Sequence, residues 1–583
     1  MSYCHFLREM KAVVPRVSPP SCRALATLCL AGLASLACAG EPITDDPSNT
    51  PGTTGGSSNG GGGTSNPGGG TDPGGPLENG GPKLRVLTKA EYRRAVEALF
   101  GSISAELKLP DDLFTSGFSS VGAGEVAINT PSVELYESTS RAIATEVFAD
   151  ASRWATLVGC QPQADLNDAC VVTFIQSFGK RAFRRDLVQE EVDQWLKVGK
   201  DTAQLAGAAG PGLAAIVSGI LQSPYFLYRI EVSSLDTSIG RLKYDGPSMA
   251  SRLAFLLTGA PPKEALLAAA ASGQLDTAEG VKAAAAALLN EPGAADGMAT
   301  FFDEFSEARL VSVVEKSKEL FPSFSPALQT SMLQATKLFI KDVVLAPGAD
   351  VRSFFNSRQT FVDATLAPIY GVQAPASGFA QITLGPETGR AGILGQAAVL
   401  AGHSLTDHNS PTRRGVFISS RFLCQVPPAP PDGVPTELPK DPNLTERQRL
   451  DLHRTNPSCK SCHALFDPLG FALEHFDSIG QYRETEHGLT IDATGTLDGV
   501  AFDGLAEMGQ VFSENKRVLS CMMTNFYRNA NGRVDATADA PLIAQLGETL
   551  AAKNYNWREF ITDFVASDAF RSAPAARLSA ETQ

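Results

Sequence analysis

The sequence lacks an excess of positive charge and lacks the short motifs of several enzyme classes. Its 49 lysine and arginine residues are outnumbered by 63 aspartate and glutamate residues, which gives a net charge of −14. An acidic surface argues against binding to a phosphate backbone as the main function, so no nucleic-acid partner is expected. Neither Gly-x-Ser-x-Gly nor His-Glu-x-x-His occurs, and no pair of carboxylates forms an obvious catalytic motif. A hydrolase therefore has little support.

Long apolar runs are also missing. Beyond the N-terminal segment no stretch reaches the roughly 18 apolar residues that a membrane-spanning helix needs, so no such helix is expected. Apolar residues make up 43 % of the chain and charged residues 19 %, which is typical of a globular protein. A chain of 583 residues is too long for one ordinary core, and we expect about two to four domains.

The N-terminal segment has the pattern of an export signal. Arg16 and Arg23 precede an apolar run, Ala24 to Cys38, that is too short to span a bilayer and suits a signal peptide over residues 1–37. Small residues before Cys38 resemble a lipoprotein signal, in which this cysteine is lipidated after cleavage. Ser35 stands where such signals usually have leucine, so an ordinary cleaved signal peptide is the alternative. Both interpretations predict an exported protein.

A glycine-rich stretch follows this signal. Residues 38–82 consist mostly of Gly, Ser, Thr, Pro and Asn, and such a stretch cannot bury a core and behaves as a flexible tether. Ala39 follows the lipidation candidate, whereas aspartate there would resemble an inner-membrane retention signal. We therefore expect an outer-membrane lipoprotein, or otherwise a periplasmic protein, that contacts the membrane only through its lipid anchor.

The ten cysteines divide by position. Cys4, Cys22 and Cys29 fall within the signal segment, and Cys38 is the lipidation candidate. An oxidising compartment permits disulfides among the rest, although sequence alone cannot establish their connectivity. Cys160–Cys170 would clip a local polar loop, and Cys424–Cys521 could close a long loop. The six cysteines of the body are Cys160, Cys170, Cys424, Cys459, Cys462 and Cys521.

The most informative motif is Cys459-Lys-Ser-Cys462-His463. This pattern predicts covalent haem c, with thioethers at both cysteines and His463 as the proximal iron ligand. A zinc ribbon needs a second cysteine pair, which the sequence lacks, and a thioredoxin-type dithiol needs a βαβ setting. A structural disulfide or another metal site remains the alternative. Export favours haem, because haem is attached to such motifs outside the cytoplasm.

The residues around the motif suggest further roles. The Pro468 carbonyl is a candidate to orient His463, and Arg413 and Arg414 are candidates to contact the haem propionates, although a solvated charge pair is the alternative. A second axial ligand would favour electron transfer, whereas an open position would favour peroxide or oxygen chemistry. The candidates for that ligand are Met508, Met522, Met523, His403, His408, His453, His475 and His487.

The periodicity predicts a mainly α fold with small β insertions and a cytochrome c-like haem segment. Thr88 and Glu91 have the spacing of a capping box, and Gly101 suits the end of that first helix. A further helix is expected to start near Thr445 and to stop before Pro457. Other helical patterns cover about 171–200, 211–231, 245–258, 263–271, 277–290, 296–308, 324–345, 505–530 and 540–567, and the strand candidates are "RQTFVDA", "FAQITL" and "LTIDATGTLDGVAFDG".

These segments resemble a family of exported bacterial proteins, abundant in planctomycetes and myxobacteria, built from the domains of unknown function 1587, 1595, 1592, 1588 and 1585 in that order. The resemblance is carried by "LTKAEYRRAVEALFG", "FIQSFGKRAFRRDLVQEEV", "LAAIVSGILQSPYFLYRIE", "GILGQAAVLAGHSLTDHNSPTRRG" with "NPSCKSCHALFDPLGFALEHFD", and "CMMTNFYRNANGR". It implies a division into segments 83–150, 151–235, 236–370, 371–500 and 501–583.

The resemblance also bears on the site. It implies that Cys459, Cys462 and His463 hold haem, and its His-Ser…Ser-Pro-x-x-Arg-Gly signature falls on His403 and the residues after it. The resemblance therefore favours His403 as a distal ligand or pocket residue and disfavours Met508. "RLAFLLTGAPP" departs from the family, whose members usually have an aromatic stretch there, so a site in that segment is in doubt.

Two functions remain open from the sequence. The first is a cell-surface or periplasmic c-type haem protein with a redox role, either electron transfer or oxidative chemistry on an unknown and possibly polymeric extracellular substrate. The second is a non-catalytic, surface-tethered binding or scaffold lipoprotein with a structural haem or disulfide. The redox partner cannot be identified from the sequence.

Overall fold

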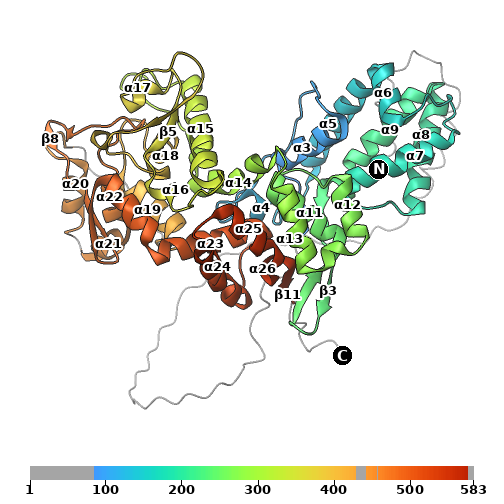
Figure 1. Ribbon diagram of the computed structural model, residues 1–583. Coiled ribbons are helices and arrows are strands. Elements are labelled where there is room, and N and C mark those ends of the chain that lie inside the picture. The colour runs from blue at the N-terminus through green and yellow to red at the C-terminus, as the bar shows by residue number, and fades with distance from the viewer. Residues whose placement is uncertain (1–83, 429–440, 456, 576–583) are drawn as a thin grey trace, which may run out of the picture. The chain divides into compact units, whose positions relative to one another are not determined.

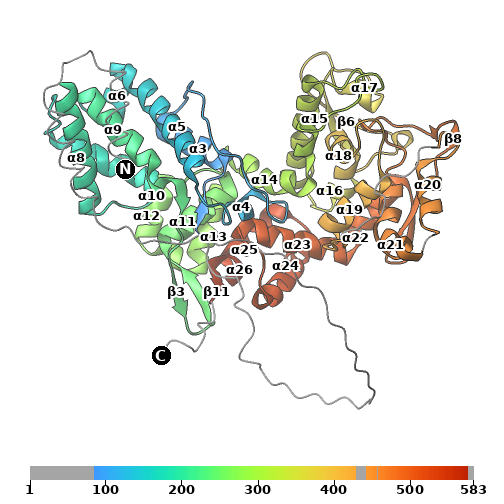
Figure 2. The same ribbon diagram turned by 180° about the vertical axis from the view of Figure 1, so that it is seen from behind.

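The computed structural model describes residues 84–428, 441–455 and 457–575. Over these residues the fold is mainly α, with sheets of only two or three strands (Figures 1 and 2), as expected. The predicted signal peptide, Cys38 and the tether lie outside the described residues. No helix of the described part is long and apolar enough to cross a membrane.

The first helices enclose a core of their own. The Thr88 hydroxyl accepts a hydrogen bond from the backbone of Glu91, whose side chain returns one to Thr88, so the predicted capping box begins the first helix, which Gly101 ends. Tyr92, Phe174 and Phe178 are among the buried side chains of this core. Its elements are β1 (Arg85–Val86), α3 (Lys89–Phe100), α5 (Thr130–Ala149), α6 (Ala151–Val158), α7 (Ala169–Phe183), α8 (Gln189–Ala206), α9 (Ala209–Gln222), α10 (Pro224–Leu227) and β2 (Tyr228–Arg229), whereas α4 (Ser119–Gly122) packs into the second core.

The expected single helix at 171–200 was wrong, because α7 and α8 are separate. Arg184 adopts a left-handed backbone conformation at the end of α7, with φ of 60°. Its buried guanidinium donates to the carbonyl oxygens of Tyr225, at 2.8 Å, and Tyr228, at 2.6 Å. A tertiary contact of this kind overrides helical periodicity, which would have continued the helix.

The second part of the fold packs around a larger core in which Phe301, Phe526 and Trp557 contact one another. The C-terminal strand β11 (Ser572–Pro574) joins β4, so the end of the described chain pairs with a segment more than 300 residues earlier. The elements of its first half are β3 (Ser233–Asp236), β4 (Arg241–Tyr244), α11 (Gly246–Thr258), α12 (Glu264–Ala271), α13 (Ala278–Leu288), α14 (Ala294–Ser306), α15 (Pro326–Ile340), α16 (Ser353–Asn356), β5 (Gln359–Val362), α17 (Ala367–Tyr370) and β6 (Ala380–Thr383).

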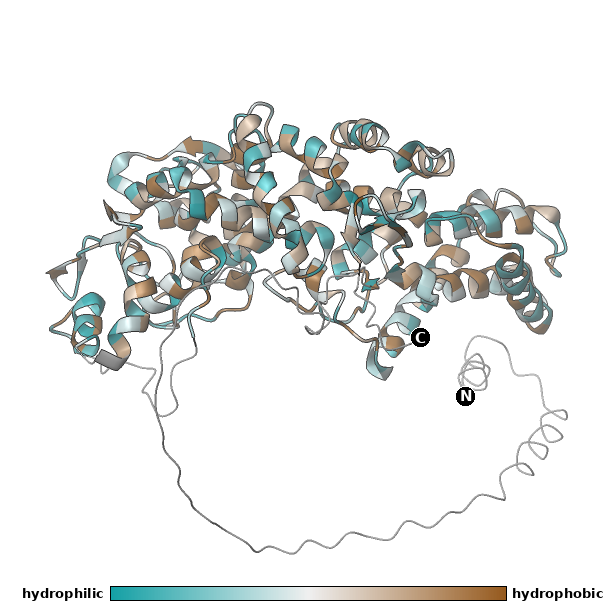
Figure 3. Cartoon of the chain, turned by 90° about the horizontal axis from the view of Figure 1, so that it is seen from below, coloured by the Kyte–Doolittle hydropathy of each residue, from teal (hydrophilic) through white to brown (hydrophobic). Residues whose placement is uncertain are grey.

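The remaining elements carry the Cys459 motif. The predicted strand segments contain β5, β6, β8, β9 and β10: β5 pairs with β6 and β9 pairs with β10, whereas β8 pairs with β7, which was not predicted. The helices alternate apolar and polar residues along their length (Figure 3), as expected for helices with one buried face. The elements are α18 (Ala397–Gly402), α19 (Pro411–Phe422), α20 (Glu446–His453), α21 (Pro457–Phe471), β7 (Thr485–Glu486), β8 (Leu489–Thr490), β9 (Thr494–Leu497), β10 (Val500–Asp503), α22 (Gly504–Glu514), α23 (Lys516–Asn531), α24 (Ala540–Ala552), α25 (Trp557–Ala566) and α26 (Asp568–Arg571).

A buried cluster of charges, the Glu231 hub, connects distant segments. Glu231 accepts hydrogen bonds from Arg85 and, at 2.8 Å, from Arg252. Arg252 also donates to the Asn531 side chain at 2.7 Å and to the Phe570 carbonyl oxygen at 3.0 Å. Burial by itself would raise the pKa of Glu231, but the guanidinium groups of Arg252 and Arg85 lower it to about 2. The hub is therefore a paired, ionised cluster that joins the start, middle and end of the fold.

Candidate functional site

The Cys459 motif lies on helix α21, beside α19 and α20 (Figures 1 and 2). Cys459 and Cys462 are free thiols and are partly exposed. They stand one helical turn apart, and His463 follows four residues after Cys459, so the two sulfur atoms and the imidazole fall on neighbouring parts of the helix surface. The site thus offers two thiols and one imidazole that are accessible together.

The other cysteines of the described body form disulfides. Cys160 is bonded to Cys170, and Cys424 is bonded to Cys521, the same two pairs that the sequence suggested. The second disulfide joins residues 97 apart in the sequence, between the end of α19 and helix α23, and so encloses the segment that carries α20 and α21. The thiols of the motif are therefore distinct from the structural cysteines.

The imidazole of His463 is held by a buried carboxylate. Its Nδ1 atom lies 2.9 Å from Oδ2 of Asp467, whose side chain has no exposed surface. The hydroxyl of Thr412, on α19, donates to the other carboxylate oxygen at 3.1 Å. With Nδ1 protonated towards Asp467, the Nε2 lone pair of His463 is available to a metal, and a carboxylate behind a histidine is the usual support of a metal ligand.

The support from Asp467 differs from the support that we predicted. The carbonyl of Pro468 faces β9, where a side chain on Gly495 would collide with it, and the described partner of His463 is Asp467. The sequence did contain a signal, since residues four apart on one helix are neighbours, and His463 and Asp467 have that spacing.

Close packing of α19 against α21 explains part of the signature around His403. Side chains on Gly415 and Gly470 would collide with the carbonyl oxygens of Phe466 and Pro411 on the facing helix. Both positions therefore require glycine for the two backbones to approach. Because the two helices approach closely, the Thr412 hydroxyl reaches the carboxylate of Asp467, and the glycines thus help to position the carboxylate that contacts His463.

His403 lies on another side of α19. Its ring stacks on Phe417 with centroids 3.7 Å apart, and its Nε2 lies 3.6 Å from a carboxylate oxygen of Glu307. Burial, and then the charges of Arg414 and Arg413, lower the pKa of His403 to about 3, so the ring is neutral. Phe417 is opposite the Thr412 face that meets α21, and no contact within the described residues joins His403 to His463. The structure does not bring these two imidazoles together.

Arg414 is a structural residue. Its buried guanidinium donates to the carbonyl oxygens of Leu473 and Phe476, both at 2.8 Å, and to the Ser404 hydroxyl at 2.8 Å. These contacts occupy the group that was expected to face haem propionates. Arg413 is exposed, and the described residues provide no ion pair for it.

The methionine candidates and most of the other histidines are also committed elsewhere. Met508, Met522 and Met523 are fully buried in the larger core, which is the ordinary role of methionine in a helix. Nδ1 of His408 lies 2.6 Å from a carboxylate oxygen of Asp407, and Nδ1 of His475 lies 2.8 Å from the carbonyl oxygen of Arg483. His487 is exposed at the β7–β8 turn.

His453 differs from these residues, because it stands beside the motif. It is the last residue of α20, and its ring centroid lies 5.1 Å from that of His463, at an interplanar angle of 72°. Phe466 lies on α21 with its ring also 5.1 Å from His463. Exposed apolar side chains, Leu452 at 62 % and Leu465 at 42 %, are close to the two histidines in sequence. The surface at the motif is therefore both ligand-bearing and apolar.

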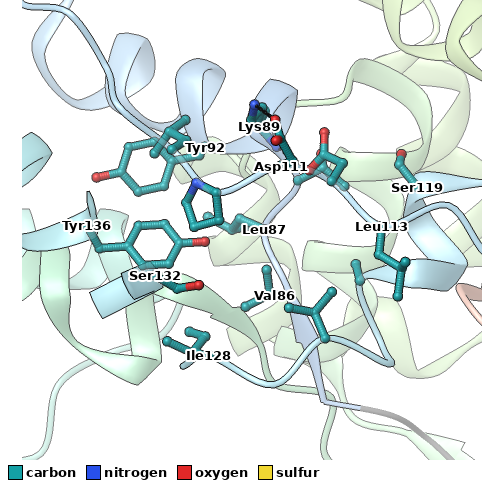
Figure 4. Close-up of a pocket in the computed structure, with 16 residues that line it drawn as sticks. Val86, Leu87, Lys89, Tyr92, Asp111, Leu113, Ser119, Ile128, Ser132 and Tyr136 are labelled. Atoms are coloured by element: carbon teal, nitrogen blue, oxygen red, sulfur yellow. Dashed lines mark hydrogen bonds and ion pairs between the residues drawn. The ribbon is translucent and has the colours of Figure 1, made fainter. Parts of the chain in front are cut away.

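Two cavities lie outside the Cys459 motif. One, of about 330 Å³, borders α20 and is lined by polar residues that include Asn409, Arg449, Arg483 and Glu486. The other, between Leu87, Tyr92 and Tyr136 (Figure 4), has room for about 20 Å³, which is the space of about one water molecule. The first is large enough for a small organic ligand, and it does not include the motif cysteines.

The donor set fits haem c better than a bare metal ion. The described residues contain no group of three or more His, Cys, Asp or Glu side chains placed to hold a metal ion. Haem requires fewer protein ligands, namely two thiols for its covalent bonds and one supported imidazole for iron. Cys459, Cys462 and His463 meet that requirement on one helix.

Five family models match consecutive segments, and each is described as a protein of unknown function. They are DUF1587 at residues 85–149, DUF1595 at 170–231, DUF1592 at 245–372, DUF1588 at 390–486 and DUF1585 at 498–570. The DUF1588 model, which covers the motif, has the cytochrome-type short name PSCyt3. No curated protein and no solved structure matches the chain. The chain therefore belongs to the family of proteins that carry these five domains in this order.

Proposed function

We propose that the protein is an exported c-type haem protein with a redox role. The observation that carries this proposal is the state of the cysteines: the body forms two disulfides, yet Cys459 and Cys462 remain free beside a carboxylate-supported His463. The cytochrome-type name of the family model over this segment supports it.

Each residue of the site has a distinct role in the proposal. Cys459 and Cys462 would hold haem through thioethers, and Nε2 of His463 would bind its iron. Asp467 accepts a hydrogen bond from Nδ1–H, fixes the ring orientation and increases the basicity of Nε2. Thr412 keeps the carboxylate in place from α19. Bound haem supplies one-electron redox chemistry, which the amino-acid side chains lack.

Export and anchoring belong to the same proposal. The signal-like segment 1–37, lipidation of Cys38 and the tether 38–82 would place the folded body at the outer membrane, or otherwise in the periplasm. Such a compartment supports haem attachment and both disulfides. Membrane fractionation of the Cys38→Ser variant tests the anchor: the protein should move to the soluble fraction, and continued membrane association would count against lipidation.

The haem itself is tested by a pyridine haemochrome spectrum of protein purified from a host with haem c maturation. We expect covalent haem in the unaltered protein and its loss in the Cys459→Ser/Cys462→Ser double variant. The matched control is Cys160→Ser/Cys170→Ser, which removes two cysteines of the same body and should retain haem. Unaltered protein without covalent haem would reject the proposal and leave the non-catalytic tethered scaffold as the better interpretation.

A further inference from the structure

The end of helix α20 presents a second imidazole to the proposed haem site. The rings of His453 and His463 have centroids 5.1 Å apart and are inclined by 72°. With metal–nitrogen bonds of about 2 Å, two imidazoles that share one metal have ring centres about 6 Å apart. The observed separation is about 1 Å shorter than in that arrangement, so binding of both rings to one iron requires the α20 end to move outward.

Helix α20 is fixed where it begins and contacts α21. The Thr445 hydroxyl and the Gln448 side chain form a capping box at its N-terminus. The Arg447 guanidinium donates to the carbonyl oxygen of Thr494, at 2.6 Å, and lies 4.4 Å from the ring centre of Phe471 on α21. These contacts hold the first turn of α20 against α21 and β9, so its last residue, His453, stays next to His463.

The local surface suits a porphyrin between two ring ligands. Leu452 and Leu465 are exposed large apolar side chains on α20 and α21, the two helices that carry the histidines. Exposed apolar surface at a ligand-bearing site is the kind of surface that a bound apolar ring covers. Among the other candidates, His403 is stacked on Phe417, the methionines are packed in the core, and His408 and His475 are bonded elsewhere, while His487 is exposed at the β7–β8 turn.

We propose that His453 is the second axial ligand of the haem iron, opposite His463. This inference rests on the proposed function, because it requires covalent haem at Cys459 and Cys462. Two imidazole ligands close both axial positions, so the iron is six-coordinate and low-spin. A closed iron favours electron transfer over direct chemistry on peroxide or oxygen. His453 therefore decides between the two redox roles that the site otherwise allows.

The test is electron paramagnetic resonance and absorption spectroscopy of the full-length ferric holoprotein. The unaltered protein should be low-spin and should not react rapidly with peroxide. His453→Ala should retain covalent haem, become high-spin and return to low-spin when imidazole is added. His453→Met should remain low-spin with a higher reduction potential, as methionine ligation raises the potential of c-type haem. His403→Ala is the matched control and should keep the spectrum of the unaltered protein.

The outcomes separate the two proposals. Unaltered protein without covalent haem overturns both. Covalent haem with a high-spin spectrum in the unaltered protein overturns only the role of His453. The same conclusion follows if His453→Ala holds haem and keeps an unchanged low-spin spectrum, because another residue must then be the ligand. Loss of low-spin character in His403→Ala alone would transfer the assignment to His403.

Discussion

The Glu231 hub and the α20–α21 edge are both clusters of ionisable side chains, but their surroundings are opposite. In the hub, Glu231, Arg85 and Arg252 have at most 3 % of their side chains exposed, and each is paired. At the edge, Cys459 and Cys462 are partly exposed free thiols. A buried charge is tolerated only when it is paired, whereas accessible donors remain available to a ligand.

The comparison shows that residue type alone does not reveal role. Arg414 lies within the signature that suggested a haem contact, yet it belongs with the hub residues, because burial and bonds to several carbonyl oxygens occupy its guanidinium. His463 lies at the edge with one ring nitrogen supported and the other available. Here, burial and the number of hydrogen-bond partners distinguish residues that stabilise the fold from residues that can bind a ligand.

The largest expected effect is from breaking the hub. Glu231→Gln leaves Arg85 and Arg252 buried without their carboxylate, and loss of one partner of a buried ion pair costs about 3–5 kcal/mol. Denaturant unfolding measures the change. The control is Asp451→Asn at the edge, which removes the exposed Arg454–Asp451 pair and should cost less than about 1 kcal/mol. If both substitutions lower the free energy of unfolding equally, the hub does not differ from the edge in its contribution to stability.

The next effect concerns Glu304, an interior acid without the full pairing of the hub. Burial raises its pKa from 4.5 to about 8, although it accepts a hydrogen bond from the Ser119 hydroxyl at 2.5 Å. The folded protein keeps a proton that the unfolded chain releases above pH 4.5, so this contribution to stability is complete below that pH and declines towards pH 8.

In Glu304→Gln the unfolding temperature should therefore decrease less between about pH 5 and pH 8 than it does in the unaltered protein. Glu279→Gln, at an exposed position, is the matched control and should leave the pH profile as it is. A profile of equal slope in Glu304→Gln and the unaltered protein would show that the Glu304 carboxyl does not titrate in this range.

The smallest expected effect is at the edge itself. Asp467→Asn keeps the shape of the side chain and its contact with Thr412 but removes the negative charge behind His463. A less basic imidazole stabilises ferric iron less well, so the reduction potential should rise while covalent haem is retained. Redox titration of the holoprotein measures this, with Asp451→Asn as control. An unchanged potential would make Asp467 a packing residue and weaken the contrast with the hub.

Local sequence signals predicted the local features of the fold and site. The Thr88–Glu91 box, the Cys459 motif and the extended segments of β5, β6, β8, β9 and β10 depend on residues close in sequence, and such signals hold in many tertiary contexts. The helix predicted to start near Thr445 and to stop before Pro457 is confirmed as α20 for the same reason. The break at Arg184 was not predictable in this way, because the carbonyl groups that bind its guanidinium lie more than 40 residues later.

The sequence by itself determined the mainly helical class, the cysteine and histidine spacing of the motif and its family membership, because these depend on composition and short-range order. Only the tertiary structure decided which neighbours complete the site. It placed His453 beside His463 and His403 on another side of α19, and it committed Arg414 to carbonyl groups. The physical reason is that burial and contact distance arise from packing between segments far apart in the chain, and no pattern within a single segment encodes them.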